Sequence, residues 1–496
     1  MPPPTYDLIV IGSGFAGATA TLSFLETTAA AAAAAATGSN NQQQPQPAGR
    51  VALVETGRRG ERCGASRWTS AYLRLDRDLE FDGGWAREMQ AVSKGLASGE
   101  YCDVLAREAG VTARWLEQEE GRGGVGVRWV RREEGDVLLG WETGQCFVYP
   151  EGGGEAVVGK LMGRIEEEEA QTGRVDVVWE TEARHVLTDE RGRVRGVQVR
   201  GKDGLVYEMH APDVVLACGG FEGNREMLAK YVGNRTHELP LIAPGLAHNK
   251  GAGLNMALEL GAATSGSFDG MHCELVDTRA TKPDAVIWGH NYGIVVNEHC
   301  KRFYDEGKKQ LFASFEMIAL ELWRDQNQKG YFITDDTIMK RFRPGWVYDT
   351  TDQEPEKADT IRELAVKLGC DPDELQKTVD EFNEACNKET PFDLMKLDGK
   401  RTHGLNPEKT NWANPIVEPP FYGYPLMAHL TFTYGGVKTN TKAQVLGTND
   451  VPIPGLWAAG EMTGLYYNEY PPATSVLRSL TFGRLAGTQI AQKLKK

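Results

Sequence analysis

The sequence lacks the features that mark membrane-spanning, metal-binding and nucleic-acid-binding proteins. It contains no run of about 18 apolar residues, so we expect no membrane span. Its eight cysteines form no CxxC pair and no Cys/His cluster with metal spacing, which favours reduced thiols in a cytoplasmic protein. Lys and Arg total 55 against 69 for Asp and Glu, and this net charge of −14 disfavours nucleic acid and anionic membranes as partners.

A glycine-rich turn follows the first apolar segment. The stretch "YDLIVIGSGFAGATATLSF" places Gly12, Gly14 and Gly17 in the pattern G-x-G-x-x-G between a predicted strand and a predicted helix. Such glycines permit a tight turn and let the backbone approach a pyrophosphate, while the helix N-terminus offers free N–H groups to the phosphates. The turn therefore predicts a dinucleotide site.

An acidic residue about 20 positions after the glycines would bind the ribose of the dinucleotide. The candidate is Glu55, at the end of "RVALVE", which follows Gly17 by 38 positions. The excess is explained by residues 27–49, an Ala-rich and then Gln/Pro-rich segment of low complexity. We expect its alanines to lengthen the first helix and its polar part to loop out. The alternative is an unrelated strand that ends in an exposed glutamate.

The later sequence predicts that the nucleotide-binding part returns near the C-terminus. "GRVRGVQVRGKDGLVYEMHAPDVVLACGG" indicates antiparallel strands and then an apolar strand, and "VPIPGLWAAGE" indicates another short strand. Between them, "EKADTIRELAVKLGC" and "DPDELQKTVDEFNEACN" are typical of an acidic amphipathic helix pair, with Asp371-Pro372 as a helix start. After two prolines, a last helix is expected to begin near Thr474 or Ser475.

Eight motifs in order resemble one superfamily, the FAD-dependent oxidoreductases of the fumarate reductase and succinate dehydrogenase flavoprotein type. They are the N-terminal glycines, "RCGASRWTSAYLRL", "YPEGGGEAVVGKLM", "VVLACGGFEGN", "NKGAGLNMALELGA", "GIVVNEHCKRFYDEG", "FTYGGVKTNTKAQVL" and "GLWAAGEMTG…TFGRLAG". The nearest branch looks like the tricarballylate dehydrogenase-like group, although Ala65 replaces an amide-bearing residue of that group.

The resemblance implies an α/β fold: a Rossmann-like FAD-binding domain in two sequence segments with an inserted α+β capping domain. We expect the first segment at 1–268, the capping domain at 269–419 and the second segment at 420–496. The expected cofactor is FAD. The residues implied for its binding are Gly12, Ser13, Gly14, Ala16, Gly17, Glu55, Thr56, Cys63, Gly64, Ala65, Ser66, Ala183, Gly219, Gly220, Gly460, Glu461, Ser475 and Val476. The absence of any histidine before His185 argues against a histidyl link to FAD near the N-terminus.

The resemblance also argues against fumarate as the substrate. At the positions where relatives carry a proton-donating arginine, a histidine and a second arginine, this chain has Gln310, Phe432 and Tyr470. Glutamine is not an acid, and neither phenylalanine nor tyrosine forms a bidentate clamp on a carboxylate.

Tyrosines serve as bases in the related ketosteroid dehydrogenases, so Tyr470 and Tyr434 are the candidates for proton removal. The alternatives are packing in the cap interface for Tyr470 and an ordinary Tyr-Gly-Gly loop for Tyr434. Arg302 is a third catalytic candidate, as a cation near a tyrosinate, with a structural role in its motif as the alternative. His272, His290 and Arg478 are candidates for substrate binding, and for a single histidine the alternative is a surface or packed residue.

Three functions remain open from the sequence. The first is an FAD-dependent dehydrogenase that desaturates a C–C bond next to a carbonyl or carboxyl group of a small molecule. The second is an ene-reductase that runs the reverse reaction, and the third is a flavin-binding isomerase or scaffold without redox turnover. No haem-binding or iron–sulfur pattern is present, so electrons would pass to or from a separate partner or dioxygen.

Overall fold

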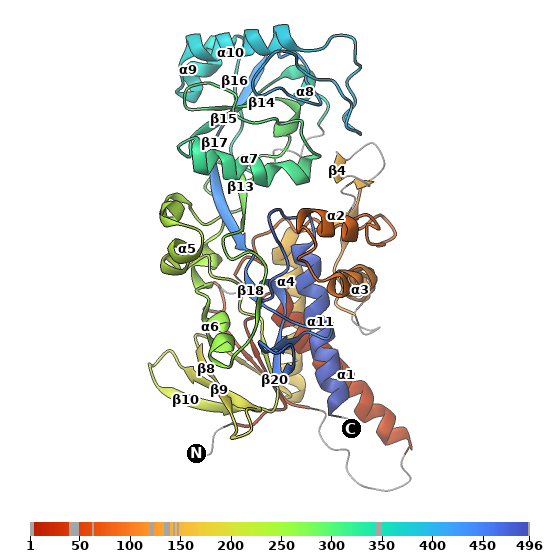
Figure 1. Ribbon diagram of the computed structural model, residues 1–496. Coiled ribbons are helices and arrows are strands. Elements are labelled where there is room, and N and C mark those ends of the chain that lie inside the picture. The colour runs from red at the N-terminus through yellow and green to blue at the C-terminus, as the bar shows by residue number, and fades with distance from the viewer. Residues whose placement is uncertain are drawn as a thin grey trace.

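The computed structural model describes residues 4–38, 49–61, 64–119, 124–132, 139–141, 144–145, 148–342 and 350–494. Two bodies built around different sheets are stacked along the long axis of the molecule (Figure 1). The lower body contains both ends of the chain, and the upper body is formed by the middle of the sequence.

The first sheet has six strands, in the order β19-β20-β11-β1-β2-β7. β1, β2, β7, β11 and β20 are parallel and β19 is antiparallel, so strands from the two ends of the sequence share one sheet. Buried apolar residues occupy every position of β1 and β2, as expected of a sheet covered on both faces. The strands are β1 Leu8–Ile11, β2 Val51–Val54, β7 Val175–Val178, β11 Val214–Leu216, β19 Gln444–Leu446 and β20 Pro452–Ala458.

Two long helices from opposite ends of the chain pack against each other in the lower body, α1 (Phe15–Gly38) and α11 (Ser475–Lys493) (Figure 1). Gly483 and Gly487 of α11 lie against Ala16 and Ala20 of α1, where a Cβ atom would collide with backbone oxygens. The predicted start of the last helix is confirmed. The alanines do lengthen α1, whereas the polar residues 39–48 lie outside the described residues.

Smaller elements surround this sheet. An antiparallel sheet has the order β10-β9-β8, and short pairs join β3 to β6, β4 to β5 and β12 to β18. The strands are β3 Trp129–Arg131, β4 Leu139–Trp141, β5 Gly144–Gln145, β6 Val148–Pro150, β8 Glu182–Thr188, β9 Val194–Arg200, β10 Val206–His210, β12 Thr264–Ser265 and β18 Gly436–Val437. The helices are α2 Trp85–Val92, α3 Gly99–Glu117, α4 Gly153–Thr172, α5 Arg225–Tyr231 and α6 Ala252–Glu259.

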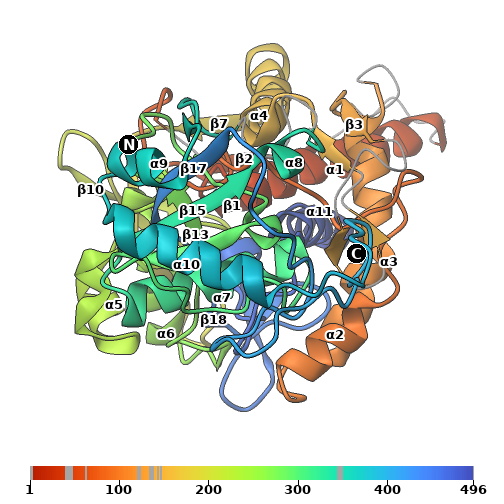
Figure 2. The ribbon, with the colours of Figure 1, turned by 90° about the horizontal axis from the view of Figure 1, so that it is seen from above.

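The upper body, which we call the cap, contains an antiparallel sheet in the order β13-β17-β15-β14, with β16 paired to β17. Viewed end-on, the cap covers the first sheet (Figure 2). The strands are β13 Met271–Asp277, β14 Ile294–Asn297, β15 Gly330–Asp335, β16 Glu356–Ala358 and β17 Phe421–Thr433. The helices are α7 Leu311–Asp325, α8 Asp336–Met339, α9 Ile361–Leu368 and α10 Pro372–Ala385, and Asp371 caps α10 as predicted.

A two-stranded ribbon connects the cap to the lower body. β13 and β17 pair from Met271↔Thr433 to Asp277↔Leu426, with a bulge between His272 and Cys273. The capping domain is expected from the sequence to end at residue 419, but β17 lies after that residue and pairs with the cap strands β13 and β15. The cap sheet therefore extends to Thr433. We keep the division into two FAD-binding segments and one cap as a proposal, with the second boundary after β17.

Candidate cofactor and substrate cavity

A cavity of about 420 Å³ lies where the lower body, the ribbon and the cap meet. One part of its wall comes from the glycine-rich start of α1 and from Glu55 at the end of β2. The other part comes from the ribbon, α7, Asp284, Trp288 and the residues before α11. The cavity therefore has a nucleotide side and a cap side.

The nucleotide side has the geometry that the glycine pattern predicts. Gly12 has φ +100°, and a Cβ atom there would lie 2.5 Å from the carbonyl oxygen of Ala217. Glu55 is 6% exposed, and its Oε2 accepts hydrogen bonds from the backbone N–H (3.0 Å) and the hydroxyl (2.6 Å) of Ser13. This places the carboxylate beside the N-terminus of α1, as a ribose ligand requires.

Most of the residues predicted to bind the cofactor are in the cavity wall. Gly17 and Gly220 are not: a Cβ at Gly17 would collide with Gly12, and one at Gly220 with Glu461 and Thr433, so both glycines permit close packing. Cys63 lies outside the described residues. The predicted residues in the wall are Gly12, Ser13, Gly14, Ala16, Glu55, Thr56, Gly64, Ala65, Ser66, Ala183, Gly219, Gly460, Glu461, Ser475 and Val476.

Tyr470 lines the cavity and caps the last helix. Its hydroxyl oxygen accepts the backbone N–H groups of Thr474 and Ser475, both at 2.9 Å, and its O–H donates to Ser475 Oγ at 3.0 Å. A phenol thus satisfies two of the N–H groups that every helix N-terminus leaves without an intrahelical partner. Burial raises the pKa of Tyr470, and the hydrogen bonds from Ser475 and Thr474 oppose that rise.

A buried network lies behind Tyr470 on the cap side. Glu316 of α7 is 3% exposed and accepts from His272 Nδ1 (2.5 Å), from the Tyr434 hydroxyl (2.5 Å) and from the Tyr470 backbone N–H (3.3 Å). The other imidazole nitrogen, His272 Nε2, lies 3.2 Å from Glu274 Oε1. Burial lowers the pKa of His272, but hydrogen bonds and charges from Glu274 and Glu316 outweigh it and raise that pKa to about 9. His272 is therefore an imidazolium at neutral pH.

Tyr434 is not in the cavity wall. It is 1% exposed, and burial together with the charge and hydrogen bond of Glu316 raises its pKa well above the ordinary value. Phe432 lines the cavity and packs against Tyr434, with ring centroids 5.8 Å apart. The phenol of Tyr434 donates to Glu316 from outside the cavity wall, and this structural role replaces the predicted role as a base.

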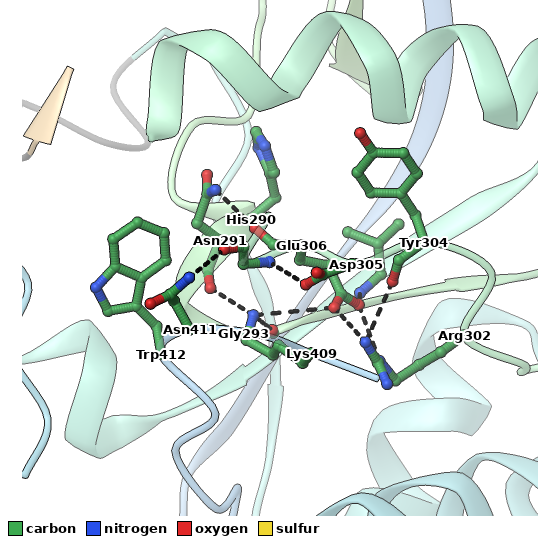
Figure 3. Close-up of polar contacts among 12 residues, drawn as sticks. His290, Asn291, Gly293, Arg302, Tyr304, Asp305, Glu306, Lys409, Asn411 and Trp412 are labelled. Carbon is green, nitrogen blue, oxygen red and sulfur yellow. Dashed lines mark hydrogen bonds and ion pairs between the residues drawn. The ribbon is translucent and has the colours of Figure 1, made fainter. Parts of the chain in front are cut away.

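Arg302 and His290 belong to a polar network inside the cap (Figure 3). Neither residue lines the cavity. Arg302 pairs with Glu306, Nη2 to Oε2 at 2.6 Å, and donates to the carbonyl of Pro407. His290 is fully buried near Ser314, and burial lowers its pKa to about 4. The predictions of catalysis for Arg302 and of substrate binding for His290 are replaced by structural roles, because the cap core encloses both side chains.

Lys409 completes this network at zero exposure. Its ammonium group donates to the carbonyl oxygens of Asn291 (2.5 Å) and Gly293 (2.9 Å) and lies 3.9 Å from Glu306 (Figure 3). Burial lowers the pKa of Lys409 to about 8, although the charge of Glu306 opposes the change.

Arg478 does line the cavity, but much of its guanidinium is engaged elsewhere. Its Nη1 donates to the carbonyl of Thr463 at 2.8 Å, and the group lies 4.8 Å from the ring centroid of Tyr466. Its role as a substrate ligand remains a prediction.

Sequence reasoning missed the acidic and aromatic part of the cap side. Glu274, Asp284, Tyr72, Trp288, Phe312 and Phe315 all line the cavity. Two periodic patterns in the sequence could have indicated these cavity residues. His272 and Glu274 alternate on β13, and Phe312, Phe315 and Glu316 have helical spacing on α7, so each set shares a face.

Within the described residues, no three His, Cys, Asp or Glu side chains are grouped to hold a metal ion. None of the helices described is long and apolar enough to cross a membrane.

Comparison with known proteins decides the family. The model of the family described as "FAD binding domain" matches residues 7–475, nearly the whole chain. The chain belongs to this FAD binding domain family. FAD is therefore the cofactor, and the prediction of a fumarate reductase-type FAD-dependent oxidoreductase is confirmed at the level of the family.

The individual proteins that this FAD binding domain protein resembles share less than a third of their aligned residues with it. It is 30% identical over 350 residues to NADH:acrylate oxidoreductase of Vibrio harveyi, covering 67% of this chain and 32% of that protein. It is 30% identical over 339 residues to 3-oxosteroid 1-dehydrogenase of Mycobacterium tuberculosis (strain ATCC 25618 / H37Rv), covering 62% of this chain and 58% of that protein. The chain thus spans about a third of the length of the acrylate oxidoreductase and somewhat over half of the length of the steroid dehydrogenase.

The fold is that of a solved flavocytochrome c3 fumarate reductase in an open conformation. That structure aligns with a TM-score of 0.73 at 21% identity, covering 99% of this chain and 79% of the other. The likeness confirms the predicted α/β FAD-binding fold with a capping domain.

The residues of the nucleotide side fit FAD by their chemistry. The wall combines a glycine cradle that side chains would fill, the start of a helix and a buried carboxylate at the end of β2. These are the groups that bind a pyrophosphate and a ribose in dinucleotide folds.

Proposed function

We propose that this protein is an FAD-dependent dehydrogenase that desaturates a C–C bond next to a carbonyl or carboxyl group of a small organic molecule. The observation that carries the proposal is the position of the Tyr470 hydroxyl, in the cavity wall and on the N–H groups of Thr474 and Ser475. FAD supplies the hydride acceptor when bound. The protein's task is to bind the substrate and to remove one proton.

In the proposed mechanism, Tyr470 Oη takes the proton from the carbon next to the carbonyl. Two backbone N–H groups at a helix N-terminus favour a negative oxygen, and so does the imidazolium of His272, whose ring centroid lies 4.8 Å from that of Tyr470. Ser475 Oγ, at 3.0 Å, is the next group that can pass the proton onward. Glu316 holds both His272 and the backbone of Tyr470 in place.

Fumarate is not the proposed substrate. Phe432 and Tyr470 line the cavity at two of the positions where the resemblance expects a histidine and an arginine, and Gln310 is not in the wall. The tricarballylate-like group is kept only as a nearest likeness, and the electron partner, the small-molecule substrate and a cytoplasmic location stay predictions.

A second candidate, an ene-reductase, is favoured by one observation. Burial raises the pKa of Tyr470, so its phenol is protonated at neutral pH and can donate a proton to a substrate carbanion.

An anaerobic flavin assay tests both candidates. Purified holoenzyme is mixed with saturated ketones and acids one at a time, and the flavin absorbance is followed. Bleaching supports the dehydrogenase. Chemical reduction followed by reoxidation with an enone or unsaturated acid alone supports the reductase. No response in either direction refutes both and favours the flavin-binding isomerase or scaffold.

A further inference from the structure

On the cap side of the cavity, one buried carboxylate oxygen accepts no hydrogen bond from the described part of the chain. Glu274 is 8% exposed and lines the cavity. Its Oε1 lies 3.2 Å from His272 Nε2, whereas its Oε2 is buried and has no hydrogen-bond partner among the residues that the structure describes. A buried carboxylate oxygen without a hydrogen-bond donor is unfavourable, so it indicates a donor that arrives with the ligand.

A second carboxylate lies in the same wall. Asp284 Oδ2 accepts the backbone N–H and the hydroxyl of Ser70, at 3.0 and 3.1 Å. Burial raises the pKa of Asp284 well above its usual range, and the charge of Glu274 raises it further. Lys282 acts in the opposite direction, but it is exposed and outside the cavity wall. A cation between these two carboxylates would remove the mutual repulsion.

The net charge of the network on this side is negative. Protonated His272 carries one positive charge between the carboxylates of Glu274 and Glu316, which leaves one negative charge. Arg478 is also in the wall, but its charge acts on Tyr101 and Tyr466, whose pKa values it lowers, and it is not among the causes of the pKa shifts of His272 and Asp284. An anionic substrate group would meet repulsion here, and a cationic group would be attracted.

Four aromatic rings, which we call the aromatic wall, complete this side: Tyr72, Trp288, Phe312 and Phe315. Trp288 contacts each of the other three, with ring centroids 6.0, 4.8 and 5.0 Å apart and planes steeply inclined. Aromatic faces together with carboxylates are the combination that binds ammonium groups in proteins.

We propose that the substrate carries a positively charged amine, held by Glu274 and Asp284 against the aromatic wall. This inference rests on the proposed function, because it names the substrate class of the same cavity. The amine serves for binding, and the C–C bond that reacts lies elsewhere in the substrate, toward Tyr470.

The test compares three probes of similar shape on the holoenzyme at pH 7.5: 3-phenylpropylamine, 3-phenylpropanol and 3-phenylpropionate. Binding is measured by calorimetry and by the flavin difference spectrum. The amine is expected to bind at least tenfold more tightly than the alcohol, and the carboxylate most weakly. A carboxylate that binds as tightly as the amine, or an amine that binds no more tightly than the alcohol, overturns the proposal.

Variants then locate the amine. Glu274→Gln is expected to weaken amine binding about tenfold and to leave alcohol binding within twofold. Asp284→Asn is also expected to weaken amine binding and to leave alcohol binding nearly unchanged. Glu384→Gln, at an exposed position of α10, is the control and should leave the binding of both probes unchanged. Equal losses for amine and alcohol in both variants overturn the assignment, since they indicate altered packing.

Binding and turnover separate the two hypotheses. If the amine preference holds while no compound bleaches the flavin, the dehydrogenase fails and the amine site stands. If neutral or anionic ketones bleach the flavin and the amine preference is absent, the amine site fails and the dehydrogenase stands.

Discussion

At the scale of single residues, Tyr470 has two roles that one substitution separates. Tyr470→Phe removes the proposed base and the helix cap but keeps the ring in the wall. Because general-base catalysis contributes roughly 10²–10⁴-fold, the rate of flavin reduction should fall by that amount. FAD content should persist, and stability should fall by about 1 kcal/mol for the lost cap. Stopped-flow absorbance measures the rate.

The pH profile gives the same hypothesis a second test. The pKa of Tyr470 is raised above its ordinary value of 10, so the phenolate fraction grows throughout the neutral and alkaline range. Flavin reduction by substrate should therefore rise with pH through the neutral range and still be rising at pH 10 in the native protein. Tyr422→Phe, a change at a cap tyrosine outside the cavity wall, should keep both rate and profile. Native rates from Tyr470→Phe would exclude this tyrosine as the base.

The pKa of His272 should lie far above the ordinary value for histidine. Its pKa of about 9 predicts an imidazolium signal in NMR spectra that persists to pH 8, and Glu316→Gln should lower that pKa. The folded-state pKa lies above the unfolded value of 6.5, so the contribution to stability is complete below pH 6.5 and is lost as pH rises to about 9. A signal that titrates near 6.5 in the native protein would contradict the network.

The nucleotide side could be predicted from the sequence because it depends on local backbone chemistry. Gly12 and Glu55 act through a turn and a strand end that short motifs specify. Glu274, Asp284 and Trp288 could not be assigned in this way, since their roles arise only where β13, α7 and a loop meet in three dimensions. Arg302 was misplaced for the related reason that a motif gives a position in sequence and no direction for the side chain.

At the scale of elements, the network of Lys409 joins the connector before β17 to the cap core. Lys409→Met should remove two hydrogen bonds to carbonyl oxygens and leave Glu306 with its ion pair to Arg302 and its hydrogen bond from the Val295 backbone. We expect a loss of roughly 2–4 kcal/mol of stability, seen as a lower thermal midpoint. Lys377→Ala, at an exposed position of α10, is the control.

An unchanged midpoint for Lys409→Met would mean that burying the ammonium is as unfavourable as its hydrogen bonds are favourable. That balance is physically possible for buried ion networks. FAD content should stay native in either case, because Lys409 is outside the cavity wall.

Helices with caps and amphipathic spacing could be predicted, as α10 and α11 illustrate. The length of β17 could not. The first half of its 13 residues pairs with β15 and β16, and the second half pairs with β13 in the ribbon. No local sequence pattern indicates that one strand will extend from the cap sheet into the connection to the lower body.

At the scale of the whole molecule, the low-complexity segment should be dispensable. Figure 1 shows the end of α1 extending beyond the rest of the lower body, and Ala29, Ala30, Ala33 and Ala34 are exposed. Gly49 lies against Phe24 of α1, so the chain returns close to the middle of that helix. Replacing residues 31–48 with a six-residue Gly/Ser linker should keep FAD content and change stability by about 1 kcal/mol or less.

Flavin absorbance and thermal melting check this shortened protein. Loss of FAD or aggregation would show that the segment contributes to the fold. The near-standard spacing between Gly17 and Glu55 that remains after the deletion is the reason to expect neither outcome.

The bulge in the ribbon has a mechanical consequence. If the cap swings, the two paired strands must bend together, and they bend most easily where their register breaks, between His272 and Cys273. His272 faces Phe432 across the ribbon at that point, and both line the cavity. The hinge and the ligand-binding surface would then be the same residues, so a molecule bound there would itself restrain the opening that releases it.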